Sequence, residues 1–344
     1  MRKIIIVCTA VVILLGGGLL LVSLNQKSRK EMHLRMTEIS LETLAALPTD
    51  TPVPTETPMP VPTDTAVPAE VPTLELIPEP TQVPMRDPAD WKNWPELPDS
   101  VSPEIKTLYV EGIAEGNDPN RFSKIGDSNT MMPSFFGCFD SGADFGYVLG
   151  PYAYLQETID HFQWSFSRNS RAAKNGATAY DMDVYHWYDD DVCWPYESAL
   201  SCEYRLFTPS IAFIGFGTND ALYDISRYEE HLRSLVEKTL SRKIVPILYS
   251  KVDDLEGDGS FNEACARIAI EYHVPFWNLW KPMSTLPNNG LREGDVHPTA
   301  NDVNLCNFSG NDLNQYGWTV RNLSALQALD RVWRLLNNMP LHGE

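Results

Sequence analysis

The sequence of the C-terminal part predicts an α/β fold, a three-layer α/β/α sandwich with a parallel sheet. Short, almost continuously apolar runs recur at 211–216, 244–249 and 274–279, and polar turns bound each run. Such runs are typical of strands that are buried on both faces of a parallel sheet. Amphipathic segments separate the runs, as expected when a helix connects each strand to the next.

The other elements follow from the same patterns. A first strand is expected at 121–125, ahead of the apolar runs. Apolar residues recur with helical spacing at 226–242, 261–272 and 322–338, which predicts three amphipathic helices. Strands and helices in this order pack with right-handed crossovers. The functional site of such a fold lies at the carboxyl ends of its strands.

An apolar segment near the N-terminus, Ile4 to Val22, is broken only by a threonine and three glycines. A helix of this length spans roughly 28 Å, close to the thickness of a bilayer core. Arg2 and Lys3 precede it as in a secretory signal peptide, but no A-x-A cleavage site follows. We expect residues 1–26 to form a single-pass transmembrane anchor or signal segment, with the head domain extracytoplasmic, and secreted if the segment is cleaved.

Residues 27–98 are predicted to be a disordered linker, rich in proline and threonine from about residue 48. The Pro/Thr-rich tract has no aromatic residue before Trp91, so it cannot bury enough apolar surface to fold. About 40 such residues in polyproline II conformation reach up to ~120 Å. Residues 99–344 then form one head domain of ordinary size.

The net charge and the cysteines indicate which binding partners and which redox compartment to expect. The chain has 27 Lys and Arg against 46 Asp and Glu, a formal net charge of −19, and no basic stripe, so no nucleic-acid partner is expected. A bridge between Cys193 and Cys202 would close a short loop and indicates an oxidising compartment. Cys138, Cys265 and Cys306 are odd in number and match no zinc spacing, so buried free thiols are an alternative for them.

Three motifs stand where strand ends are expected. Ile-Gly-Asp-Ser-Asn-Thr at 125–130 follows the first strand, Gly-Thr-Asn-Asp at 217–220 follows a later one, and Asp-Val-His-Pro-Thr at 295–299 precedes the last helix. Each motif alone is weak, because ordinary turns and helix caps use the same residues. A fourth motif, Lys-Asn-Gly-Ala-Thr-Ala at 174–179, lies between the first two.

In this order the four motifs resemble those of the SGNH hydrolases, also called the GDSL esterase/lipase family. The resemblance covers the head domain and neither the anchor nor the linker, and it implies an SGNH/flavodoxin-like fold. It also implies that Ser128 is the nucleophile and His297 the general base. The oxyanion hole would consist of the backbone N–H groups of Ser128 and Gly176 and the side-chain amide of Asn219.

The carboxylate that orients His297 departs from the family pattern. The family usually places it three residues before the histidine, where this chain has Gly294. Asp295 lies two residues before His297 and Glu293 four before. Asp295 is the preferred candidate, since a one-residue shift in a loop is small and aspartate is the shorter, better-fixed acceptor. A dyad of Ser128 and His297 without a close carboxylate is the alternative.

These residues predict a serine esterase that hydrolyses a carboxylic ester through an acyl-enzyme, with no metal and no organic cofactor. The expected substrates are O-acetyl groups of an envelope or extracellular polysaccharide, because a stalked head could reach into an envelope. A lipid ester is an alternative substrate. A non-catalytic binding head on the same fold is the competing class, and the intact serine, glycine, asparagine and histidine motifs argue against it.

Overall fold

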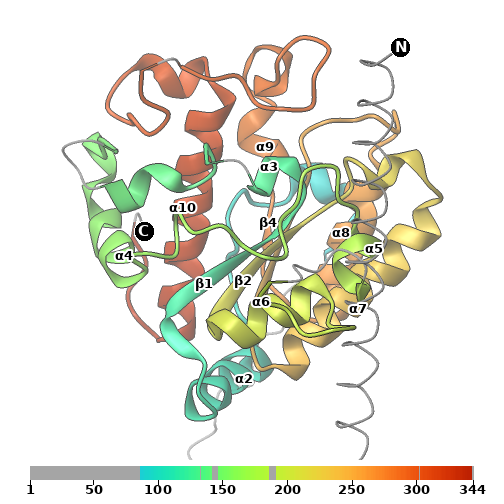
Figure 1. The fold of residues 1–344 in the computed structure, drawn as a ribbon. Coiled ribbons are helices and arrows are strands. Elements are labelled where there is room, and N and C mark those ends of the chain that lie inside the picture. The colour runs from blue at the N-terminus through green and yellow to red at the C-terminus, as the bar shows by residue number, and fades with distance from the viewer. Residues whose placement is uncertain (1–85, 132, 142–145, 186–190, 302, 343–344) are drawn as a thin grey trace, which may run out of the picture. The chain divides into compact units, whose positions relative to one another are not determined.

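The computed structural model describes residues 86–131, 133–141, 146–185, 191–301 and 303–342 (Figure 1). The predicted membrane segment and the Pro/Thr-rich tract up to residue 85 lie outside these residues. Within the described ranges, no helix combines the length and the apolar character needed to cross a membrane.

The described unit is built on a parallel sheet of four strands in the order β1-β2-β3-β4. Its strands are β1 (Asp118–Gly126), β2 (Pro209–Gly215), β3 (Val245–Tyr249) and β4 (Phe276–Trp277). This confirms the parallel sheet that the apolar runs predict. The last strand has two residues instead of the expected six, and Pro275 next to it has no N–H to extend the ladder.

Helices cover both faces of the sheet. Figure 1 shows α10 (Gly317–Leu336) on one side of the strands and α6 (Ala199–Phe207), α7 (Ile225–Ser241) and α8 (Ser260–Glu271) on the other. The remaining α-helices of the described residues are α2 (Pro103–Ala114), α3 (Ser128–Met131), α4 (Gln156–His161), α5 (Ala179–Asp183) and α9 (Trp280–Met283). The predicted helices at 226–242 and 261–272 thus lie within one residue of α7 and α8.

Helix α10 begins five residues before the predicted start at 322. The hydroxyl of Thr299 accepts a hydrogen bond from the amide of Gly317 at 2.9 Å, and the Thr299 carbonyl accepts one from Trp318 at 3.0 Å. These two bonds satisfy free amides of the first helical turn. The cap comes from a residue distant in the chain, so the local pattern could not reveal it.

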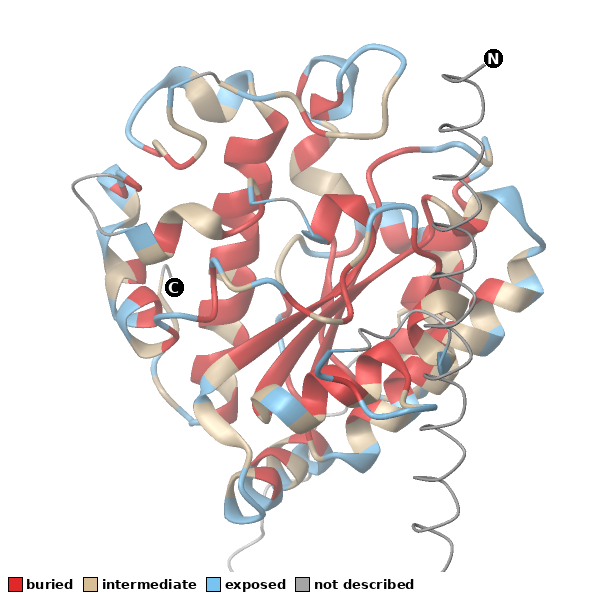
Figure 2. Ribbon diagram, viewed as in Figure 1, coloured by how far each residue is buried: buried red, intermediate tan, exposed pale blue. Residues whose placement is uncertain are grey.

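Buried residues gather in the strands and on the inner helix faces (Figure 2). Every residue of β2 is buried. In β1, Phe122 meets the rings of four other phenylalanines edge-on, with centroids 5.1, 5.4, 5.7 and 5.9 Å away. Each such pair contributes about 0.5–1.5 kcal/mol beyond its buried area. The strand that leads to the predicted nucleophile is therefore firmly anchored in the core.

The described part of the predicted linker, residues 86–98, packs on the α/β unit. Trp91 and Trp94 are buried, and their rings meet Trp280 and Phe276 edge-on at 5.3 Å. The side chain of Asn278 donates to the carbonyl of Trp91 at 2.8 Å. The packed unit therefore starts before the predicted boundary at residue 99, because two tryptophans supply apolar surface that the Pro/Thr-rich tract lacks.

Two disulfides join cysteines of the described chain. The predicted Cys193–Cys202 bridge is confirmed. A second bridge links Cys138 to Cys306 across 168 residues, so the alternative of free thiols is wrong for this pair. It ties the segment after the predicted nucleophile to the segment after the predicted base. Cys265 is a buried free thiol, and burial raises its pKa to about 12.

We expect replacement of both Cys138 and Cys306 by serine to lower the free energy of unfolding by about 5 kcal/mol, since the bridge closes a long loop in the unfolded chain. The same change at Cys193 and Cys202 should cost about 3 kcal/mol, because that loop is short. Urea unfolding of both double variants measures the two values. A larger loss for the short loop would contradict this loop-length argument.

Candidate active site

The serine turn follows directly on the end of β1. Ser128 is the first residue of α3 and is 8% exposed. The amide of Asn129 donates to the Asp127 carboxylate at 2.9 Å, and the amides of Thr130 and Met131 donate to the Asp127 carbonyl at 3.1 and 2.9 Å. These bonds close the turn tightly and place the serine at the carboxyl edge of the sheet.

His297 lies against this serine. Its Nε2 is 2.9 Å from Ser128 Oγ, and its Nδ1 is 2.6 Å from Asp295 Oδ1. With Nδ1–H donating to the carboxylate, Nε2 is left as the acceptor of the serine proton. The structure thus brings together the three residues that the sequence proposes as nucleophile, base and orienting carboxylate.

A tight loop accounts for the shifted position of the carboxylate. The amide of Arg292 donates to the His297 carbonyl at 3.0 Å, and Leu291 and Pro298 form an antiparallel bridge. Gly294 has a φ of +66°, a left-handed conformation that favours glycine. The chain reverses there, and the following residue, Asp295, faces the imidazole.

Asp295 Oδ1 also accepts hydrogen bonds from the amides of Val296 at 2.7 Å and His297 at 3.2 Å. The hydrogen bond from the imidazole, with help from these amides, holds the pKa of the Asp295 carboxyl below its ordinary value. Glu293 is exposed in the same loop and makes no hydrogen bond or ion pair with another described residue. The distances therefore favour Asp295 over Glu293 as the orienting group.

The glycine block lies beside the serine turn. Gly126, at the end of β1, forms a parallel bridge with Ala173, and the Lys174 amide donates to the Gly126 carbonyl at 3.1 Å. Gly176 follows with a φ of +74°, and a Cβ there would meet no atom within 4 Å. Backbone conformation, not crowding by the protein, is what favours glycine at this position.

Asn219 follows β2 and reaches the glycine block. Its Nδ2 donates to the carbonyl of Ala177 at 3.0 Å. A carboxamide nitrogen carries two hydrogens, so the second remains for a substrate oxygen. The predicted oxyanion donors of Gly176 and Asn219 thus lie on two segments that are hydrogen-bonded to each other.

Asp220 is a further residue of the site that the sequence motifs did not single out. Its carboxylate accepts from the amide of Ala179 at 3.0 Å through Oδ1 and from the amide of Gly217 at 3.0 Å through Oδ2. It is 5% exposed, and burial raises its pKa to about 6. One buried carboxylate therefore clamps the glycine block to the asparagine turn. Its place directly after Asn219 was visible in the sequence, but its two partners were not.

We expect Asp220→Asn to lower kcat at least tenfold with little change in KM. A carboxamide has one acceptor oxygen, so one of the two backbone amides would face another donor and the oxyanion donors would move apart. Asp224→Asn, at the exposed N-cap of α7, is the matched control. Steady-state kinetics on a chromogenic ester measure the effect, and equal rates for the two variants would argue against the clamp.

The raised pKa of Asp220 also predicts a pH dependence of stability. An aspartate in the unfolded chain ionises near pH 3.8, and the folded one near 6. Between these values the unfolded state binds fewer protons, so this residue lowers the free energy of unfolding as the pH rises from about 4 to about 6. Urea unfolding at pH 4, 5, 6 and 7 measures the free energy of unfolding of wild type and Asp220→Asn. We expect the value of the wild type minus that of the variant to fall as the pH rises. A constant difference between them would refute it.

A cluster of Cys193, Glu197 and Cys202 has the spacing of possible metal ligands among the described residues. The two cysteines form a disulfide, so neither offers a thiolate. Glu197 is engaged by Arg205, which donates to both of its carboxylate oxygens at 2.7 and 2.8 Å. The disulfide and the Glu197–Arg205 pair therefore stabilise the loop between Cys193 and Cys202.

Comparison with known proteins points to one family. The family model described as "GDSL-like Lipase/Acylhydrolase family" matches residues 125–301, a range that includes the serine, glycine, asparagine and histidine motifs. Among curated proteins, vitellogenin-1 of Solenopsis invicta is 30% identical over 130 residues, which are 36% of this chain and 7% of that protein's length.

Two solved structures are similar to the chain at low identity. A GDSL-like lipase from Bacteroides thetaiotaomicron VPI-5482 is 17% identical, with 66% of this chain and 98% of that chain covered and a TM-score of 0.39. A catalytic mutant of an acetylxylan esterase from Geobacillus stearothermophilus is 18% identical, with 62% and 95% covered and a TM-score of 0.38.

Proposed function

The chain belongs to the GDSL-like lipase/acylhydrolase family, and from this premise we propose that it hydrolyses a carboxylic ester with Ser128 as nucleophile. One observation carries the proposal. His297 lies 2.9 Å from Ser128 Oγ on one side of its ring and 2.6 Å from Asp295 on the other. A serine hydroxyl is a weak nucleophile at neutral pH, and this arrangement is the one that activates it.

In the first half of the reaction, Ser128 Oγ attacks the ester carbonyl while His297 Nε2 takes its proton. The carboxylate of Asp295 stabilises the imidazolium that forms. The imidazolium then returns the proton to the departing alkoxide as the carbon–oxygen bond breaks, which leaves an acyl group on Ser128. In the second half, a water molecule attacks the acyl carbon while Nε2 takes its proton. The bond from this carbon to Ser128 Oγ then breaks, the imidazolium returns the proton to Oγ, and the carboxylic acid is released.

The negative oxygen of each tetrahedral intermediate needs hydrogen-bond donors. We assign this role to the backbone N–H groups of Ser128 and Gly176 and to the free N–H of Asn219. Support comes from the bonds that join the glycine block to β1 and to Asn219. Loss of one such donor typically lowers the rate ~10²- to 10³-fold.

We propose a short acyl group, such as an O-acetyl group on an envelope or extracellular polysaccharide. The two disulfides support an oxidising compartment for the head. The N-terminal anchor, if it spans the membrane as proposed, would hold the head outside the cytoplasm.

Hydrolysis of p-nitrophenyl acetate and p-nitrophenyl octanoate, with Ser128→Ala as control, tests the acyl length. Acetate release from acetylated xylan and fatty-acid release from phospholipid vesicles test the two substrate classes. We expect kcat/KM to favour the acetyl ester and acetylated polysaccharide. A preference for octanoate and phospholipid would assign the chain to lipids, and absence of any Ser128-dependent turnover would favour a binding head.

A further inference from the structure

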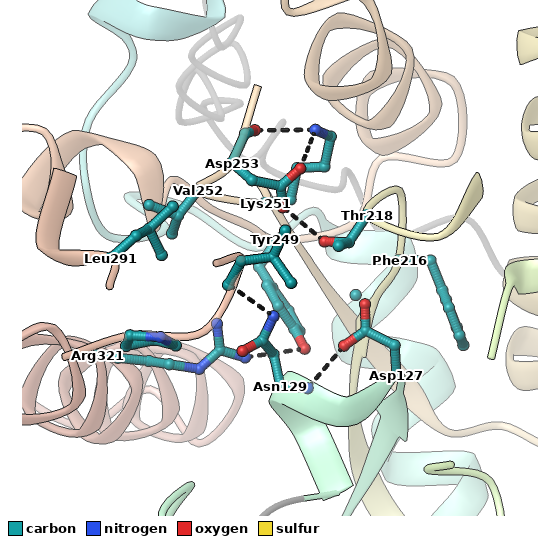
Figure 3. A pocket seen from close by; sticks show the side chains of 13 residues that line it. Asp127, Asn129, Phe216, Thr218, Tyr249, Lys251, Val252, Asp253, Leu291 and Arg321 are labelled. Atoms are coloured by element: carbon teal, nitrogen blue, oxygen red, sulfur yellow. Dashed lines mark hydrogen bonds and ion pairs between the residues drawn. The ribbon is translucent and has the colours of Figure 1, made fainter. Parts of the chain in front are cut away.

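A small cavity lies behind the serine turn, between β2, β3 and α10 (Figure 3). Its volume is about 20 Å³, which is room for one water molecule. Asp127 and Asn129 line it from the serine turn, Val296 from the histidine loop, and Arg321 from α10. Neither Ser128 nor His297 lines the cavity.

Arg321 is buried in this region, with 3% of its surface exposed. Its guanidinium lies over the rings of Phe135 at 4.5 Å and Tyr249 at 5.3 Å, and its Nη2 donates to the Tyr249 hydroxyl at 3.3 Å. Its Nε finds no acceptor among the described residues. A buried donor without a partner costs about 1–3 kcal/mol, so such groups are normally paired with protein or water.

Asn129 has an unpaired acceptor that complements the unpaired Nε donor of Arg321. Its Nδ2 donates to the Val296 carbonyl at 3.3 Å, which fixes the orientation of the carboxamide because a flipped amide would set two oxygens against each other. Its Oδ1 is buried and has no donor among the described residues. In Figure 3 the side chains of Asn129 and Arg321, from different elements, both point into the pocket.

We propose that this cavity binds one water molecule, which accepts a hydrogen bond from Arg321 Nε and donates one to Asn129 Oδ1. The cavity joins an unpartnered donor to an unpartnered acceptor, and a water molecule can serve both at once. The carboxylate of Asp127, which lines the same cavity, offers an acceptor for its second hydrogen. The lining holds two carboxylates, Asp127 and Asp253, and two cations, Lys251 and Arg321, and Lys251 pairs with Asp253 at 2.7 Å. These formal charges balance, so the lining favours neither an anion nor a cation.

The bound water gives Asn129 a fixed partner at each end of its carboxamide. One end holds Val296, the residue before His297, and the other is held through the water by α10. Asn129, Arg321 and the water therefore act as positioning groups that keep the histidine loop against the serine turn. This effect on the reaction rests on the proposed esterase function, whereas the water site itself does not.

A crystal structure of the full-length wild-type chain at a resolution that shows ordered water tests the site without reference to activity. We expect one density peak in the cavity, about 3 Å from both Arg321 Nε and Asn129 Oδ1. A cavity without density, or a direct hydrogen bond between the two side chains, would overturn the proposal even if the protein is an active esterase.

Arg321→Met tests the positioning role by removing the Nε donor at similar side-chain length. Arg334→Met is the matched control, since Arg334 is equally buried on the same helix but bonds to Asp330 and Glu157. We expect Arg321→Met to lower kcat about tenfold with KM unchanged, while Arg334→Met keeps the wild-type kcat. Equal kcat for the two variants would overturn the positioning role. If Arg321→Met does not fold, the wild-type density still decides whether the water is bound.

Discussion

Ser128→Ala is expected to abolish ester hydrolysis, with kcat at least ~10⁴-fold below wild type. The serine oxygen is the atom that lies 2.9 Å from His297 Nε2, and alanine offers nothing in its place. The residual rate would come from the oxyanion donors and substrate binding alone. Release of p-nitrophenol from the acetyl ester measures the loss.

The control for this variant is Ser241→Ala, an exposed serine at the end of α7 whose hydroxyl bonds only locally to the Lys238 carbonyl. It should retain wild-type kcat. Circular dichroism and the urea midpoint of Ser128→Ala should match wild type, because the change removes one hydroxyl and leaves the backbone hydrogen bonds of the turn in place. Turnover by a correctly folded Ser128→Ala close to that of wild type would remove Ser128 from the mechanism.

Asp295→Asn should lower kcat steeply with little change in KM. The loss could reach ~10⁴-fold, as for the same Asp-to-Asn change in the catalytic triad of a serine protease. A carboxamide at this position can present its N–H to the imidazole and favour the tautomer whose Nε2 carries the proton, which cannot then accept one from Ser128. Glu293→Gln makes the same chemical change in the same loop and should be mild, since Glu293 makes no hydrogen bond or ion pair with His297.

The effect of Asp295→Asn should persist across the neutral range. The hydrogen bond from His297 lowers the pKa of Asp295, so the carboxylate stays ionised down to a pH below its ordinary value. Rates of both variants from pH 6 to pH 9 check this expectation. A larger loss for Glu293→Gln would move the orienting role to that residue, and near-normal rates for both would leave a Ser128–His297 dyad.

The strands were predictable because each is a short apolar run between polar turns, and burial on both faces leaves such a run few alternatives. The packing of residues 86–98 was not, because Trp91 and Trp94 are buried by side chains far along the chain. The Cys138–Cys306 bridge was hidden for the same reason, since spacing says nothing about cysteines 168 residues apart.

The residues of the site also differ in how far the sequence could predict them. Ser128 and Asn219 stand in motifs directly after β1 and β2, so their meeting at one edge of the sheet followed from the fold class. His297 lies in the loop before α10, and the motif order of the family suggested its place there. The contact of Asp295 with His297 depends on the chain reversal at Gly294. The sequence suggested this only as a one-residue shift of the carboxylate. Asp220 clamps segments 41 residues apart, a contact that only the folded chain shows.

Covalent labelling of the purified full-length chain with a fluorophosphonate probe tests the central claim most directly. The probe phosphonylates serines activated by a neighbouring base, and peptide mapping by mass spectrometry locates the adduct. If His297 activates Ser128, we expect a single adduct, on Ser128, which is absent from Ser128→Ala and strongly reduced in a His297→Ala variant. An adduct on another residue, or none on a folded chain that hydrolyses p-nitrophenyl acetate, would contradict it.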